Sequence, residues 1–78
     1  MATRTINTGL GRIVEVVRTS ERPLCYSYTF KEYATRNIWV AEDGRTYVWY
    51  KGEFYRAIRT DEDWCPYSIT LRASCISA

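Results

Sequence analysis

Aromatic and arginine side chains are concentrated between residues 38 and 60, and they are the groups in this chain best suited to binding. Trp, Tyr and Arg bury large rigid surfaces or form fork-shaped hydrogen bonds, and they dominate the energetics of protein interfaces. We therefore expect a contact surface for a partner built from six residues: Trp39, Arg45, Tyr47, Trp49, Phe54 and Arg56.

Groups that could perform catalysis are scarce. The chain has no histidine, which excludes Ser–His and Cys–His nucleophile pairs and histidine metal ligands. The three cysteines do not form a C-x₂-C pair, and the acidic run 61–63 lacks the alternate spacing of a calcium loop. The sequence therefore predicts a protein that is not an enzyme, with no catalytic residue, no metal and no cofactor.

Length and composition limit the remaining classes. The 78 residues predict a single domain, with residues 1–10 and 75–78 loosely held. No apolar stretch reaches the ~18 residues of a membrane span, and the first twenty residues lack the apolar core of a signal peptide. We therefore expect a cytoplasmic protein that does not bind membranes, with free thiols at Cys25, Cys65 and Cys75.

The elements that must position the aromatic and arginine side chains are mostly strands. Alternation or β-branched content marks runs at residues 12–18, 24–30, 38–41, 45–50, 53–60 and 67–73. Thr29 followed by Glu32 fits a capping box, so we expect a short helix over 30–36, unless the strand 24–30 simply continues. The predicted class is α+β and β-rich, with about five antiparallel strands, open or curled into a small barrel.

Gly-containing turns predict a three-stranded meander over residues 38–60. Asp43-Gly44 and Lys51-Gly52 separate its strand-like runs, and such pairs form hairpin turns because Gly adopts positive φ without strain. A two-residue loop at Lys51-Gly52 pairs Trp49 with Phe54, so these two side chains share one face.

The first turn leaves one register open. A two-residue loop places Ile38 and Val40 on the Trp49 face, whereas a three-residue loop places Trp39 and Ala41 there. In either register both faces of the meander carry apolar and aromatic groups. Something must cover the second face: the other strands and the helix, a second copy of the chain, or a partner.

Three functions follow from this composition. The first is a small non-catalytic protein that occupies a surface of another macromolecule. Small phage or mobile-element inhibitors of host defence, including anti-CRISPR proteins, share this size and lack of familiar motifs. The second is a small β-barrel that binds nucleic acid through stacked rings and arginines, although the net charge of +2 gives little support. The third is a structural protein that assembles as a homodimer or larger homo-oligomer.

Overall fold

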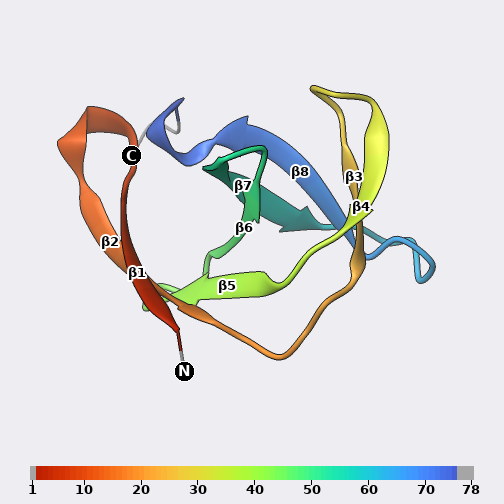
Figure 1. The fold of residues 1–78 in the computed structure, drawn as a ribbon, viewed down its shortest axis with the longest axis horizontal. Helices are drawn as coiled ribbons and strands as arrows, with labels where there is room; N and C mark the ends of the chain where they lie inside the picture. Colours follow the sequence, from red (N-terminus) through yellow and green to blue (C-terminus); the bar gives the residue numbers. More distant parts are fainter. Residues whose placement is uncertain (1, 76–78) are drawn as a thin grey trace.

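The computed structural model of the chain describes residues 2–75, and nearly all of their regular structure is β-strand. The strands form one sheet in the order β1-β2-β5-β6-β7-β8-β3-β4, and only β3 and β8 pair in parallel (Figure 1). The predicted β-rich class is confirmed. The elements are β1 (Thr3–Asn7), η1 (Gly9–Gly11), β2 (Ile13–Arg18), β3 (Leu24–Ser27), β4 (Glu32–Thr35), β5 (Ile38–Ala41), β6 (Thr46–Tyr50), β7 (Glu53–Arg59), β8 (Tyr67–Arg72) and η2 (Ala73–Cys75).

The predicted helix over 30–36 is wrong, because this segment is a turn followed by β4, which pairs antiparallel with β3. The Ser27 hydroxyl accepts a hydrogen bond from the Phe30 amide at 3.2 Å, and Lys31 adopts a positive φ of 53° that reverses the chain. The side chain of Ser27 thus stabilises a turn where the capping-box pattern had suggested a helix start.

The strand count and the barrel also differ from expectation. The sheet has eight strands and is open, with β1 and β4 at its two edges. Strand β1 was not predicted from the sequence, because Ile6 is its only buried residue and the others are polar. Without a run of alternating apolar residues, the pattern gives no strand signal.

The predicted meander is confirmed, together with the register of its second hairpin. Trp49 lies opposite Phe54, and Tyr50 lies opposite Glu53. Lys51 and Gly52 have φ values of 53° and 79°, and positive φ at both central positions characterises the type I′ turn that suits two-residue hairpins.

The first hairpin of the meander uses the three-residue loop. The Ala41 amide donates to the Arg45 carbonyl at 2.9 Å, and Gly44 has a φ of 86° within the loop. Trp39 consequently lies opposite Tyr47, so Trp39 and Ala41 share the face that carries Trp49.

Both faces of the meander are covered within one chain. The face carrying Tyr47 packs against β1, β2 and η2, and its buried cluster, here called the first core, consists of Ile6, Val16, Trp39, Ala41, Tyr47, Phe54 and Ala73. The opposite face packs against β3 and β8, and this second core consists of Cys25, Ile38, Val48, Tyr50, Tyr55, Ala57, Tyr67 and Ile69. The two-sided apolar pattern therefore needs no second subunit to explain it.

Within residues 2–75, no helix is long and apolar enough to cross a membrane.

Candidate binding cleft

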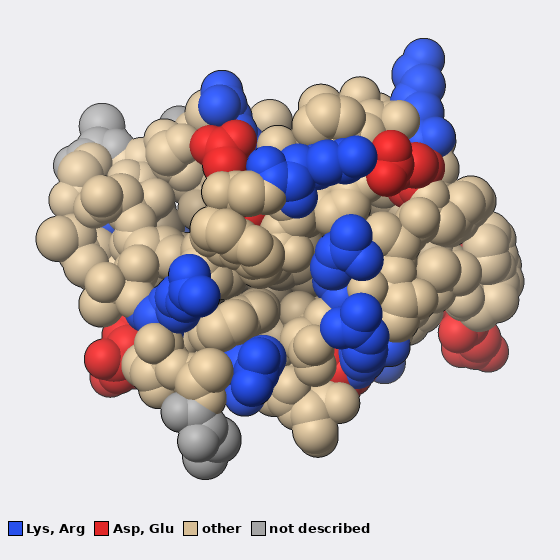
Figure 2. Space-filling view, in the orientation of Figure 1, with Lys and Arg blue, Asp and Glu red and all other residues tan. Residues whose placement is uncertain are grey.

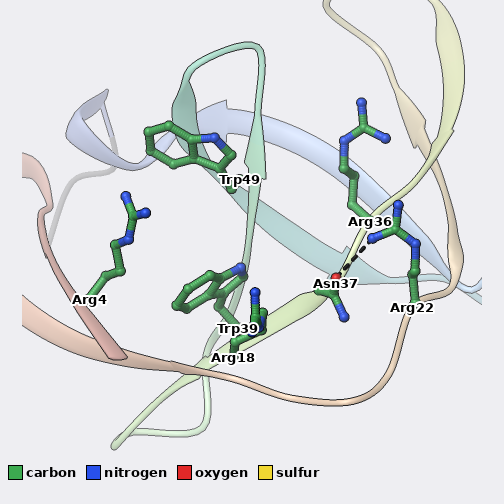
Figure 3. A pocket seen from close by; sticks show the side chains of 7 residues that line it. All are labelled: Arg4, Arg18, Arg22, Arg36, Asn37, Trp39 and Trp49. Carbon is green, nitrogen blue, oxygen red and sulfur yellow. Dashed lines mark hydrogen bonds between the residues drawn. The ribbon is translucent and has the colours of Figure 1, made fainter. Parts of the chain in front are cut away.

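Four arginines and two tryptophans line a cleft of about 250 Å³ on the first-core side of the sheet (Figure 3). The arginines come from β1, from the end of β2, and from the two connections that flank β3 and β4, whereas both tryptophans come from the meander. We call this surface the arginine–tryptophan cleft, and its lining residues are Arg4, Arg18, Arg22, Arg36, Asn37, Trp39 and Trp49.

Two of the arginines lie over the two indole rings. Arg18 is the direct partner of Trp39 in the β2–β5 ladder, and its guanidinium carbon lies 6.0 Å from the Trp39 ring centroid. The guanidinium carbon of Arg4 lies 5.3 Å from the Trp49 ring centroid. At these distances the cation is attracted by the negative face of the ring, which helps to hold each guanidinium in place.

Hydrogen bonds position the other two arginines. Arg22 donates from Nη1 to the Asn37 side-chain oxygen at 2.8 Å. The side-chain Nδ2 of Asn37 in turn donates to the Thr19 carbonyl at 3.3 Å. Arg36 donates from Nη1 to the Thr35 carbonyl at 2.8 Å. Each of these guanidinium groups keeps further N–H donors free for a ligand.

The cleft is positively charged although the chain as a whole carries only +2. Within residues 2–75, none of the four cleft guanidinium groups lies within 4.0 Å of a carboxylate. The ion pairs in these residues join Arg45 to Asp43, Lys51 to Glu32, and Arg72 to Glu53. Figure 2 shows Lys and Arg side chains across this face, with the visible Asp and Glu side chains mainly toward its edges.

The six residues predicted as a contact surface have separate roles. Trp39, Tyr47 and Phe54 are buried in the first core and do not form a free surface, although Trp39 also lines the cleft. The three-residue loop places Trp39 beside Tyr47 on this face, which packs against β1 and β2. Trp49 is 43% exposed and lines the cleft, packed edge-on against Phe54 at 4.9 Å.

The other two predicted residues, Arg45 and Arg56, do not line the cleft. Arg45 forms an ion pair with Asp43 at 3.5 Å, and Arg56 donates from Nε to the Thr46 carbonyl at 3.2 Å. The four cleft arginines were missed at the sequence level because they come from separate segments. The only sequence signal for them is the excess of arginine over lysine, nine against two.

Two of the three cysteine thiols lack the exposure of a reactive thiol. Cys25 and Cys65 are buried, and Cys75 is exposed. Burial raises the pKa of the Cys25 thiol to about 11 and also raises the pKa of Cys65, so both are protonated at neutral pH and are poor nucleophiles. Residues 2–75 contain no group of three or more His, Cys, Asp or Glu side chains that could hold a metal ion.

Searches found no matching protein family, no similar curated protein and no similar solved structure.

Proposed function

We propose that this protein is a non-catalytic binding protein that holds single-stranded nucleic acid in the arginine–tryptophan cleft. The observation that carries the proposal is the convergence of four arginines on two tryptophans, with no carboxylate within 4.0 Å of the guanidinium groups in residues 2–75. A guanidinium forms bidentate contacts with phosphate, and an exposed indole offers a stacking surface that every base can use.

The distribution of charge supports this proposal better than the net charge does. The acidic run 61–63 lies in the connection between β7 and β8, which contributes no residue to the cleft. A local basic surface is what a phosphate backbone encounters, since charges beyond about 10 Å are screened at ordinary salt concentrations.

Fluorescence anisotropy with a labelled mixed-sequence oligonucleotide tests the proposal directly. We expect binding at low salt, with log K falling linearly as log salt rises, by about 0.7 for each phosphate that is neutralised. Engagement of all four arginines would give a slope of about −3 on the same estimate. Undetectable binding at low salt would exclude the proposal.

A matched pair of charge-removing variants locates the contact. Arg22→Ala removes an exposed cleft arginine whose guanidinium is hydrogen-bonded to Asn37, whereas Arg12→Ala removes an exposed arginine outside the cleft. We expect Arg22→Ala to weaken oligonucleotide binding about five-fold at low salt and to reduce the slope by about 0.7. Equal effects of the two variants would mean that binding depends on overall charge and does not involve the cleft.

A partner protein is the second candidate, and the exposure of Trp49 beside the arginines favours it. Tryptophan and arginine are the residue types most enriched in interface hot spots. In this case the protein would act as a small inhibitor of the phage or mobile-element kind, anti-CRISPR-like in type, with Trp49 inserted into the partner. Capture from a nuclease-treated host lysate that is lost with Trp49→Ala would support this candidate, and capture that needs nucleic acid would oppose it.

A further inference from the structure

A second cluster of rings lies on the outer face of the β3–β4 hairpin, away from both cores. Tyr26 contacts Tyr28 at 4.9 Å between ring centroids and Tyr33 at 4.8 Å, and Tyr33 in turn contacts Trp64 at 5.7 Å. These four rings and Glu62 line a groove of about 200 Å³, here called the tyrosine–tryptophan groove. It shares no lining residue with the arginine–tryptophan cleft.

The strand geometry explains why these rings face outward. Tyr26 and Tyr33 are direct partners in the β3–β4 ladder, and their neighbours Cys25 and Ala34 face the second core. Side chains alternate across a strand, so Tyr26 and Tyr33 must point to the opposite face. Tyr28, Tyr33 and Trp64 are 64%, 52% and 61% exposed, which is far more than rings used only for packing. An exposed cluster of this kind marks a binding surface.

The charged side chain that lines the groove is acidic. Glu62 is the only lining side chain that is charged at neutral pH, and it accepts a hydrogen bond from the Trp64 indole at 3.0 Å through one carboxylate oxygen. The second oxygen remains available, and Asp61 and Asp63 flank it in the chain. The faces of the rings add their own negative potential.

Comparison with the other rings shows what is missing from this groove. Elsewhere the chain places its own cations over aromatic faces: Arg4 over Trp49, Arg59 over Tyr67, and Lys51 over Phe30. Within residues 2–75, no Arg or Lys lies over Tyr26, Tyr28, Tyr33 or Trp64. The groove therefore combines aromatic faces and a carboxylate without an internal cation.

We propose that the tyrosine–tryptophan groove is a second binding site, independent of the cleft, and that it takes an arginine side chain from a partner protein. A guanidinium stacks on an aromatic face and forms a fork-shaped pair with a carboxylate. Trp64 and Glu62 present those two groups side by side. Lysine fits less well because its ammonium is more strongly hydrated and lacks the planar fork.

NMR titration of the ¹⁵N-labelled protein with a blocked Gly-Arg-Gly peptide tests this site. We expect millimolar binding, with shifts of the Trp64 indole N–H and of the amides of Tyr26 and Tyr33. The same peptide with citrulline in place of arginine keeps the shape but loses the charge, and it should cause no such shifts. Absence of shifts at tens of millimolar peptide, or equal shifts with citrulline, would overturn the proposal.

Exposed variants identify the groups that carry the binding. Glu62→Gln should weaken peptide binding about three-fold, and Trp64→Ala about five-fold, as expected for an exposed ion pair and an exposed cation–π contact. Glu15→Gln makes the same charge change on β2, outside the groove, and should leave peptide binding unchanged. Equal peptide affinity for Glu62→Gln and Glu15→Gln would overturn the proposal. It would also be overturned if an oligonucleotide shifted the NMR signals of the groove residues with the same affinity as it binds the cleft.

Discussion

The cleft and the groove are both lined by aromatic rings, but their charged side chains have opposite sign. In the cleft the indoles of Trp39 and Trp49 are overlaid by Arg18 and Arg4, whereas the groove has bare rings beside a carboxylate. A net charge of +2 therefore conceals two surfaces whose lining charges have opposite sign. Ligand chemistry is decided by which charged groups lie against the rings, and the whole-chain total does not report it.

The two regions also differ in how they are supported. The cleft rests on the first core, because Trp39 is buried and packs edge-on against Phe54 at 5.3 Å. The groove rings lean on one another outside either core. Changes under the cleft should therefore destabilise the fold, whereas changes within the groove should affect stability much less.

The largest expected effect separates these two kinds of support. Phe54→Ala should lower the free energy of unfolding by about 3–5 kcal/mol, since it leaves a cavity in the first core. Tyr33→Ala in the groove should cost about 1 kcal/mol or less, because the ring is mostly exposed. Urea unfolding followed by circular dichroism measures both, and similar losses would show that the groove is structurally as important as the core.

The next effect concerns Tyr50, which lies in the second core with Arg36 of the cleft over its ring at 5.2 Å. Its hydroxyl is buried and makes no hydrogen bond of standard geometry within residues 2–75, and burial together with the nearby Glu32 carboxylate raises its pKa to about 12. In the unfolded chain the Tyr50 hydroxyl loses its proton near pH 10. The raised pKa therefore contributes its full stabilisation to the folded state below pH 10, and this stabilisation is lost as the pH rises through the pKa of the folded protein.

Tyr50→Phe should therefore remove part of the alkaline destabilisation. We expect the variant to gain about 2 kcal/mol in unfolding free energy relative to the wild type between neutral pH and pH 12. It should be no less stable at neutral pH, because it removes an unpaired hydroxyl. Parallel pH profiles of the two proteins would show that Tyr50 does not ionise on unfolding in this range.

The smallest effects compare Trp49 of the cleft with Trp64 of the groove, each of which should affect the binding of one ligand. Trp49→Ala should weaken oligonucleotide binding about ten-fold through loss of one stacking surface, and should leave arginine-peptide binding unchanged. Trp64→Ala should do the reverse, as described above for the peptide. Loss of both ligands in either variant would mean that the cleft and the groove act as one site.

The sequence predicted those parts of the fold that depend on short-range chemistry. Lys51-Gly52 determined the second hairpin and its register correctly, because a type I′ turn leaves one pairing for its flanking strands. The register of β5 stayed open because Asp43-Gly44 fits loops of two lengths. The parallel pairing of β3 with β8 was not predicted, since it joins segments about 40 residues apart with no local signal.

The candidate site was predicted only in part, for a similar reason. Trp39 and Trp49 were identified by residue type and lie at the cleft, but the face that carries them is overlaid by β1, which the sequence did not reveal. The pairing of β2 with β5 places Arg18 directly opposite Trp39. Arginines gathered by topology cannot be grouped by their spacing along the chain.

The two-sided burial of the meander has a consequence for synthesis of the chain. Along β6, Tyr47 points into the first core and Val48 into the second, so neighbouring residues depend on different ends of the polypeptide. The first core needs Ile6 from near the amino end, and the second needs Ile69 from near the carboxyl end. While the chain is still emerging from a ribosome, the aromatic side chains of the meander stay exposed until β8 is released. A nascent or truncated chain is therefore prone to aggregate.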